Sequence, residues 1–362
     1  MGTPQDRPPD PEKASAHTDP EVTGCFIVHD DITVPESVGA VTEDFPAVSP
    51  GEPPSSTASQ ALLLTAYAAS AEHYRQVVRA VRSRPDLFLK PLLMLCRESN
   101  DSWSSCVDAE LEVPHSPTAA EAALDRMQEI GEQVEAYRPL DDSTRASRLH
   151  EMLILRYMDS RPDRAIEPTP NPDLSDGYEY PLVASLLESP GATGRNLLES
   201  LRRSGLVRGA VKDRLHICWS CGDFRLNFRE VCPHCSSLVF HQEATLHHFR
   251  CSYVGRKSEF EQNDALQCPK CDRRLRHVGV DYDKPREDFW CSNCDRQFEE
   301  PDVEVHCLNC GATGNPSDAE MRTYREYTIT PDGKLAAQEG SYPETDVAAL
   351  LRESPGLYPP GA

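Results

Sequence analysis

Ten of the fourteen cysteines in this chain stand in five Cys-x-x-Cys pairs, all after residue 217. The first two pairs lie within CWSCGDFRLNFREVCPHC, residues 218–235, with ten residues between them. In a small secreted chain such cysteines would favour disulfides, but the first 21 residues contain no apolar segment typical of a secretory leader. One Cys-x-x-Cys turn presents two thiolates, and two turns supply the four ligands of a tetrahedral zinc ion. The pairs therefore predict a region whose fold is held by metal.

Sequence spacing gives a preferred grouping of these ligands. The first predicted site is a zinc ribbon made of Cys218, Cys221, Cys232 and Cys235. The second predicted site, with nineteen residues between its pairs, is made of Cys268, Cys271, Cys291 and Cys294. The last pair, Cys307 and Cys310, lacks two ligands, and His248 with Cys251 in HHFRC has the right spacing to supply them, with His247 as the other candidate. An interleaved arrangement, in which the last pair shares a metal with an earlier pair, stays open. The expectation is two to three zinc ions.

Such sites point to a structural and not a catalytic role for the metal. A catalytic zinc keeps a coordination position open for water, whereas sites filled by four protein ligands are closed. The sequence contains no His-Glu-x-x-His motif, no Walker A loop and no Gly-x-Ser-x-Gly elbow. The remaining enzymatic hypothesis is the segment GVDYDKP, where Asp281 and Asp283 would share one side of a strand. A solvated strand edge explains that segment more simply, and we expect no enzymatic activity and no catalytic residue.

The first half of the chain alternates in the manner of an α/β domain. Four segments read as strands: residues 25–32, 61–67, 87–95 and 106–113. Two read as helices, residues 71–84 and 117–136, and the second carries Ala123, Met127, Ile130 and Val134 on one apolar face. This alternation predicts βαβ units and a parallel sheet. The cysteines of this half, Cys25, Cys96 and Cys106, stand in apolar surroundings and read as buried thiols.

The predicted fold class is thus an α/β domain followed by a β-rich domain with small leading helices and several zinc ribbons. Composition and the positions of Pro- and Gly-rich stretches divide the chain into five segments. They are an acidic and Pro-rich tail (1–23), the α/β domain (24–140), a helix and linker (141–177), the zinc-binding domain (178–330) and the end of a hairpin with an acidic, Pro-rich tail (331–362). The leading helices are expected at 181–189 and 193–205, with a longer helix at 143–159. Near the end, REYTITPDGKL is typical of a hairpin turning at Asp332-Gly333.

Two families resemble parts of this sequence. YEYPLVASLL, DRLHICWSCGDFRLNFREVCPHC, HHFRCSYVG, CPKCDRRLRHVGVDYDKP and WCSNCDRQFEEPDVEVHCLNCG, between residues 178 and 313, resemble the thaumarchaeal output domain, a cysteine-rich module of prokaryotic signalling proteins. That resemblance implies a zinc-binding output module, beside receiver, histidine-kinase or diguanylate-cyclase domains, whose twelve ligands are the residues grouped above. The α/β domain resembles a receiver domain in outline, through Asp30 and Asp31 after the first strand. It lacks a phosphoacceptor aspartate after ALLLTAY and a lysine before Pro114, which would make it a degenerate receiver.

Charge limits the class of partner. The formal net charge is −22, and residues 1–60 hold 11 acidic and 2 basic side chains, which opposes loose binding to nucleic acid or anionic lipid. Residues 201–300 hold 17 basic and 15 acidic side chains. The basic loop RRLRH and the two leading helices leave a nucleic-acid-binding regulator of the zinc-ribbon or winged-helix-like type as the alternative. The favoured function is a protein-interaction module in a two-component-like signalling pathway. No apolar run reaches the roughly 20 residues that span a bilayer, so we expect a cytoplasmic protein without membrane contact.

Overall fold

The computed structural model describes residues 24–27, 47–48, 63–68, 70–96, 103–112, 117–189, 191–262 and 265–342. The chain divides into two compact units. The first, called the sheet unit here, comprises residues 1–174, 178–212 and 325–362, and the second, the cysteine unit, comprises residues 175–177 and 213–324. The predicted acidic pair Asp30 and Asp31, the side chain of Cys25 and both predicted tails up to residue 23 and beyond residue 342 lie outside the described residues.

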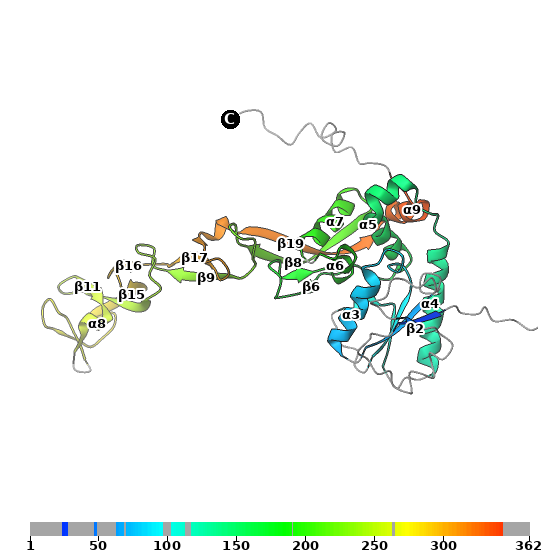
Figure 1. Cartoon of the computed structure of the whole chain (residues 1–362). Helices are drawn as coiled ribbons and strands as arrows, with labels where there is room; N and C mark the ends of the chain where they lie inside the picture. Colours follow the sequence, from blue (N-terminus) through cyan, green and yellow to red (C-terminus); the bar gives the residue numbers. More distant parts are fainter. Residues whose placement is uncertain are drawn as a thin grey trace, which may run out of the picture. The chain divides into compact units, whose positions relative to one another are not determined.

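The sheet unit contains the parallel sheet that the sequence predicts (Figure 1). Its strands are β1 (Gly24–Ile27), β2 (Ala47–Val48), β3 (Leu63–Ala68), β4 (Leu92–Cys96) and β5 (Ala109–Glu112). They pair in the order β2-β1-β3-β4-β5, and every pair is parallel. This is the order of the flavodoxin-like doubly wound fold. All five residues of β4 are buried, as expected for a strand covered on both faces of a parallel sheet.

Two helices follow the predicted segments around this sheet. Helix α3 (Ala71–Arg82) begins at Ser70, whose hydroxyl accepts a hydrogen bond from the backbone N–H of His73. Helix α4 (Pro117–Glu135) contacts β3, β4 and β5, and the first three residues of its predicted apolar face are buried. The sequence therefore placed both helices, and the apolar period of the second one identified the buried face of α4.

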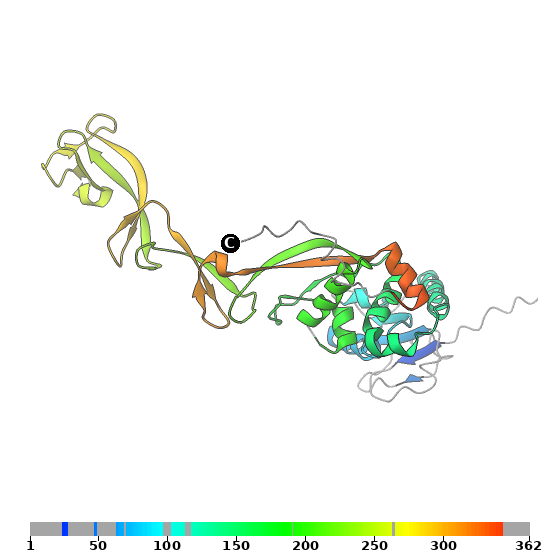
Figure 2. The ribbon, with the colours of Figure 1, turned by 90° about the horizontal axis from the view of Figure 1, so that it is seen from above.

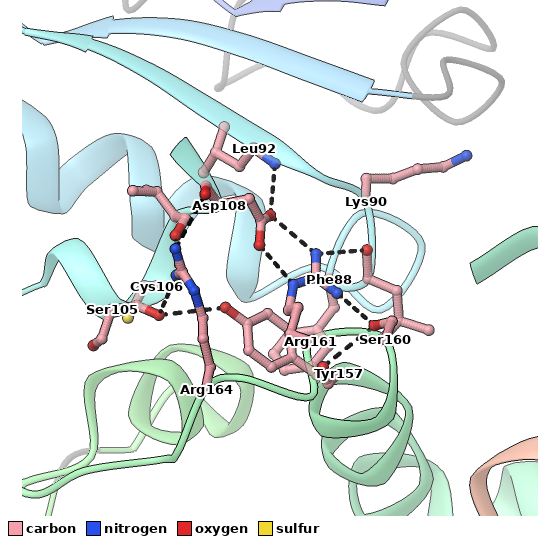
Figure 3. Close-up of polar contacts among 12 residues, drawn as sticks. Phe88, Lys90, Leu92, Ser105, Cys106, Asp108, Tyr157, Ser160, Arg161 and Arg164 are labelled. Carbon is pink, nitrogen blue, oxygen red and sulfur yellow. Dashed lines mark hydrogen bonds and ion pairs between the residues drawn. The ribbon is translucent and has the colours of Figure 1, made fainter. Parts of the chain in front are cut away.

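A buried ionic network anchors the start of β5 (Figure 3). The Asp108 side chain is fully buried and accepts hydrogen bonds from the guanidinium groups of Arg161 (2.7 and 3.0 Å) and Arg82 (3.2 Å). It also accepts one from the backbone N–H of Leu92, at the start of β4 (2.9 Å). Burial alone would raise the pKa of Asp108, but Arg161 and Arg82 hold that pKa well below its usual value. The Asp108 carboxylate thus connects β4 and the start of β5 with helix α3, through Arg82, and with Arg161.

That next helix begins a helical layer of the sheet unit. Helix α5 (Asp142–Asp159) is capped by Asp141, and every residue from Met152 to its end is buried. Helices α6 (Pro181–Leu187) and α7 (Ala192–Arg203) add Leu182, Val183, Leu198 and Leu201 to the same hydrophobic core. The two leading helices, which the sequence groups with the cysteine-rich region, therefore belong to the sheet unit by their contacts. The short strands β6 (Thr169–Pro170) and β7 (Tyr178–Glu179) pair with each other between α5 and α6.

The predicted hairpin at Asp332-Gly333 is wrong. The chain there forms helix α9 (Pro331–Glu339), which packs against α5. The Thr330 hydroxyl accepts a hydrogen bond from the N–H of Gly333 (3.1 Å), and Pro331 stands at the first helical position. An N-cap threonine followed by proline favours a helix start, and this outweighs the turn tendency of Asp-Gly. Gly333 is required for packing, because a Cβ atom there would lie 2.0 Å from the carbonyl oxygen of Leu206.

Two long strands connect the units. Strand β8 (Val207–Ile217) enters the cysteine unit, β19 (Glu320–Ile329) leaves it, and the two pair with each other (Figure 2). Within the cysteine unit the elements are β9 (Leu226–Val231), β10 (Phe240–His248), β11 (Tyr253–Arg256), α8 (Lys257–Phe260), β12 (Glu261–Gln262), β13 (Ala265–Gln267), β14 (Arg274–Leu275), β15 (Tyr282–Cys291), β16 (Gln297–Phe298), β17 (Asp302–Cys307) and β18 (Thr313–Gly314). Its sheets run β18-β17-β9, β11-β10-β15-β16 and β12-β13-β14. This confirms the β-rich character predicted for the cysteine-rich region. Among the described helices of both units, none is long and apolar enough to cross a membrane.

Candidate metal centres

Each predicted ligand pair adopts the same tight turn. The backbone N–H of the residue after the second ligand donates to the carbonyl oxygen of the first ligand, at 2.8 to 3.0 Å. That residue has a positive φ between 54° and 75° in all six turns: Gly222, Ser236, Ser252, Asp272, Asp295 and Gly311. The left-handed conformation turns the chain back so that both ligand side chains of a pair point to the same side. The His248-x-x-Cys251 segment follows this geometry as closely as the five cysteine pairs do.

Three clusters of four ligands result, and the ligand atoms within each cluster lie within 4.8 Å of one another. The outer cluster is Cys218, Cys221, Cys307 and Cys310. The middle cluster is Cys232, Cys235, Cys291 and Cys294. The inner cluster is His248, Cys251, Cys268 and Cys271. All twelve residues predicted as ligands are present in these clusters.

The preferred grouping from the sequence is wrong, however, because the pairs are nested and not consecutive. When the His248–Cys251 pair is counted as the third of six, the first pair lies with the sixth, the second with the fifth and the third with the fourth. This is a fuller version of the interleaved arrangement that the sequence left open. Cys232 and Cys235 therefore do not complete the site of Cys218 and Cys221.

Strand pairing explains the nesting. Strand β9, which separates the first two cysteine pairs, does not fold into a local hairpin but pairs antiparallel with β17 along its whole length. The register places Cys307 opposite Leu226, near the first pair. In the same way β10 pairs antiparallel with β15, so that Cys291 lies opposite Phe240 and close to the second pair. The later half of the cysteine unit (the returning half) thus runs antiparallel beside the earlier half (the outgoing half). Each ligand turn of one half therefore lies next to a ligand turn of the other.

The clusters have the dimensions of a tetrahedral thiolate site. The shortest sulfur–sulfur distances between facing pairs are 3.6 and 3.8 Å in the outer cluster, 3.6 and 3.8 Å in the middle one and 3.5 Å in the inner one. Zinc–sulfur bonds of about 2.3 Å in a tetrahedron place sulfurs about 3.8 Å apart, whereas a disulfide needs about 2.05 Å. None of the thirteen cysteines after Cys25, eleven in the clusters and two in the core, forms a disulfide. The residues present therefore fit a four-coordinate metal ion such as zinc.

The histidine of the inner cluster is His248, as predicted. Its Nδ1 lies 3.2 Å from the sulfur of Cys251 and 3.6 Å from that of Cys271. His247 faces the opposite side of β10, where its Nδ1 lies 3.4 Å from a carboxylate oxygen of Asp283. Neighbouring residues of a strand point to opposite faces, so only one of the two histidines can reach the cluster.

Two asparagines support the clusters, and sequence reasoning missed them. The side-chain amide of Asn309 donates to the sulfur of Cys221 (3.6 Å), and that of Asn293 donates to the sulfur of Cys235 (3.7 Å). Each asparagine lies in the ligand turn that comes later in the chain, and its amide contacts a cysteine of the earlier turn in the same cluster. Donors of this kind reduce the negative charge on a thiolate and orient it. The asparagine that CSNC and CLNC share at the third position is the sequence signal that could have revealed this role.

The two remaining cysteines with described side chains are not ligands. Cys96 and Cys106 are buried in the core of the sheet unit, as predicted. Burial raises the pKa of Cys96 to about 11 and that of Cys106 to about 12. Both therefore stay protonated at neutral pH and are chemically inert.

The model of the thaumarchaeal output domain 1 family matches residues 142–329, just over half of the chain. This chain belongs to the thaumarchaeal output domain 1 family. The match begins at the first residue of α5 and ends at the last residue of β19. The thaumarchaeal output domain is thus larger than the segment 178–313 recognised in the sequence, because it includes α5 and both connecting strands. No curated protein and no solved structure matches the chain.

The nested grouping can be tested by counting metals in crossed variants. Alanine at Cys218, Cys221, Cys307 and Cys310 removes one whole cluster in the structure, so native mass spectrometry should find two metals per chain. Alanine at Cys218, Cys221, Cys232 and Cys235 damages two clusters and should leave one. The consecutive grouping predicts the reverse result for the two variants, and observing that reverse would show that the nesting is wrong.

Proposed function

We propose that this thaumarchaeal output domain protein is a non-catalytic, zinc-dependent module that binds a protein partner in a signalling pathway through its cysteine unit. The observation that carries the proposal is that most of the exposed large apolar side chains belong to the unit that contains the three ligand clusters. Eleven of the thirteen exposed large apolar residues in the described chain belong to the cysteine unit: Trp219, Phe228, Leu238, Val239, Phe249, Val254, Val278, Val280, Val303, Leu308 and Met321. Exposed apolar side chains concentrated on one part of a protein are typical of an interaction surface.

Zinc is the metal that best suits these clusters. Thiolate and imidazole ligands in a tetrahedron favour zinc over magnesium or calcium, which prefer oxygen ligands. The buried apolar clusters of the cysteine unit are small and include ligands, such as Cys268 beside Leu246 and Phe260, and Cys232 beside Phe298. The metal would therefore supply much of the folding free energy of this unit.

A closed site has no position for substrate or water, and this supports a structural role. The aspartates of the enzymatic hypothesis have other roles. The Asp281 carboxylate accepts hydrogen bonds from the backbone N–H groups of Arg276 (2.8 Å) and His277 (3.0 Å). Strand β15 begins one residue after it, and Asp283 faces His247. Asp281 thus precedes the strand that carries Asp283, and the contacts of both carboxylates support a non-catalytic role for this segment.

We further propose that the N-terminal sheet is a degenerate receiver. The strand order 2-1-3-4-5 supports this, since receivers share it with flavodoxins. Strand β3, which carries the phosphoacceptor at its end in receivers, contains no carboxylate between Leu63 and Ala68. Signals would then reach the output module through contacts and not through phosphorylation of that strand.

Nucleic acid is the alternative partner. Lys270, Arg273, Arg274 and Arg276 are exposed beside the inner cluster and give it a local basic surface. Against this, residues 213–324 contain 14 Lys or Arg and 19 Asp or Glu, and metal-bound thiolates would add further negative charge. Several of the arginines are also neutralised, for example Arg229 by Glu304 and Arg225 by Asp223. The charge of the unit therefore favours a protein partner.

The proposal can be tested by photo-crosslinking in cells of the source organism. A photoreactive phenylalanine at Leu308 or Val280, both more than half exposed on the cysteine unit, should yield a discrete protein adduct. The same probe at Leu335, which is exposed on α9 of the sheet unit, serves as the matched control and should yield none. Alanine at Cys218 and Cys307 should abolish the adduct by unfolding the outer cluster. Adducts sensitive to nuclease would support the nucleic-acid alternative, and the absence of any adduct specific to the cysteine unit would contradict the proposal.

A further inference from the structure

The sheet unit contains a ligand-sized cleft between helices α3 and α6, which lie side by side (Figure 1). A cavity of about 530 Å³ is lined by Arg79, Trp103, Glu179 and the end of α6. A second cavity of about 290 Å³ adjoins it and shares those three side chains. Pockets that hold small molecules have volumes of about 300 to 1,000 Å³, so the cleft can accommodate a small organic ligand.

The two walls of the cleft carry opposite charges. Helix α3 supplies Arg79, with Arg75 in the adjoining cavity, while β7 and the end of α6 supply Glu179 and Glu188. Arg75 pairs with Glu72 of its own helix (3.7 Å), whereas Arg79 forms no ion pair with Glu179 or Glu188 among the described residues. A ligand that carried both charges could therefore bridge the two walls.

The charged side chains of Arg79 and Glu179 each contact a neutral side chain. The Arg79 guanidinium lies over the Trp103 ring, 4.8 Å from its centroid. Glu179 is 94 % buried, and within the described part of the chain its side chain accepts one hydrogen bond, from the amide of Asn171 (3.0 Å). An amide does not neutralise a carboxylate, and burial of an unpaired charge is costly. Glu179 is thus a buried carboxylate at a cavity, and no cation pairs with it among the described residues.

The overall charge excludes a simple anion as the ligand. The two cavities together are lined by four carboxylates, of Glu72, Asp173, Glu179 and Glu188, and by two arginines. A phosphate ester in the cleft would stand beside Glu179 and Glu188, whose repulsion would offset the attraction of Arg79. A simple amine would leave Arg79 without a partner. A zwitterion satisfies both walls.

We propose that this cleft binds a small zwitterion, an amino acid or short peptide, with its carboxylate on Arg79 and its ammonium group on Glu179. The wall formed by α3 and Trp103 precedes the family-matched span, and the wall formed by Glu179 and α6 lies within it. A ligand held between these walls would join the parallel sheet to the output module. This makes the cleft an input site for a metabolite signal, independent of the metal clusters.

Isothermal titration of the full zinc-loaded chain with each of the twenty L-amino acids and with X-Gly dipeptides tests the proposal. At least one zwitterion should bind saturably with a Kd below about 1 mM. For that ligand, the C-terminal amide and the N-acetyl derivative should each bind about tenfold or more weakly, because each lacks one charge-assisted contact. Saturable binding by none of the panel, or equal binding of the ligand and its two derivatives, would overturn the proposal.

Variants locate the site. Arg79→Gln and Glu179→Gln should each weaken binding about tenfold or more, and Glu179→Gln should not weaken binding of the N-acetyl derivative further. Arg203→Gln and Glu129→Gln, at exposed positions on α7 and α4, are the matched controls and should bind as the unaltered chain does. If Glu179→Gln does not fold, Glu188→Gln at the exposed rim tests the same wall. Unchanged affinity in Arg79→Gln together with Glu188→Gln or Glu179→Gln would show that the ligand binds elsewhere.

Discussion

Chelation of the metals should unfold the cysteine unit and leave the sheet unit folded. Structural zinc sites contribute on the order of 10 kcal/mol each to folding, more than the whole stability of many domains. The cysteine unit contains three ligand clusters that could each hold a metal ion, and its described apolar clusters are small. The sheet unit has a large hydrophobic core and no such ligand cluster among its described residues. The expected loss therefore falls on residues 213–324 alone.

Hydrogen exchange followed by mass spectrometry can measure this result. After treatment with a strong chelator under reducing conditions, amides of β9, β10, β15 and β17 should exchange at the rate of an unfolded chain. Amides of β4 and of the buried half of α5 should keep their protection. Re-addition of zinc should restore the first group, which controls for irreversible damage. Retained protection of β10 and β15 without metal would show that the clusters are not what holds the unit together.

Replacement of Asp108 by asparagine should destabilise the sheet unit by about 3 to 5 kcal/mol, because it leaves two buried arginines without their anion. Both Arg82 and Arg161 have fully buried side chains, so neither can recover the lost interaction from water. Asp86→Asn is the matched control, since the Arg84–Asp86 pair is partly exposed and should contribute less than about 1 kcal/mol. Thermal or urea unfolding, followed by near-ultraviolet circular dichroism, compares the two variants.

The effect of Asp108 also has a predicted pH dependence. Its pKa is lowered in the folded state, so its contribution to stability is fully present above the ordinary pKa of an aspartate and is lost as the pH falls towards the lowered value. The difference in unfolding free energy between the unaltered chain and Asp108→Asn should stay constant from pH 7 to about 4 and shrink below that. A difference that already shrinks between pH 7 and 5 would contradict the assignment of a lowered pKa.

The sequence predicts the local features of this protein well and its long-range features poorly. Helices α3, α4 and α5 and strands β1, β3, β4 and β5 follow from local sequence signals, which placed them to within a few residues, although the strand predicted at 87–95 begins only at Leu92. Strand β2 was not predicted. The identity of the twelve ligands is also a local signal, because each turn is complete within five residues. Even the choice of His248 over His247 followed from its spacing to Cys251.

The grouping of the ligands is long-range and could not be read from spacing. Closing Cys221 against Cys232 spans ten residues, while closing it against Cys307 spans 85, and chain entropy favours the shorter loop by about 2 kcal/mol. Pairing of β9 with β17 and of β10 with β15 outweighs that difference, and strand pairing is not a property of one segment. The hairpin predicted at Asp332-Gly333 failed for a related reason, since contact with Leu206 and α5 decides between turn and helix there.

The pairing of β8 with β19 makes the cysteine unit an insertion within another fold. The chain leaves the sheet unit after Lys212 and returns to it at Arg325, and the two strands that carry it out and back are hydrogen-bonded neighbours. A short turn between those strands would close the sheet unit without the intervening hundred or so residues, and exposed strand ends are sites where folds tolerate such exchange. The cysteine unit can therefore be lengthened, shortened or replaced in evolution as a cassette, one nested cluster at a time, while the fold that carries the cleft and the buried Asp108 stays unchanged.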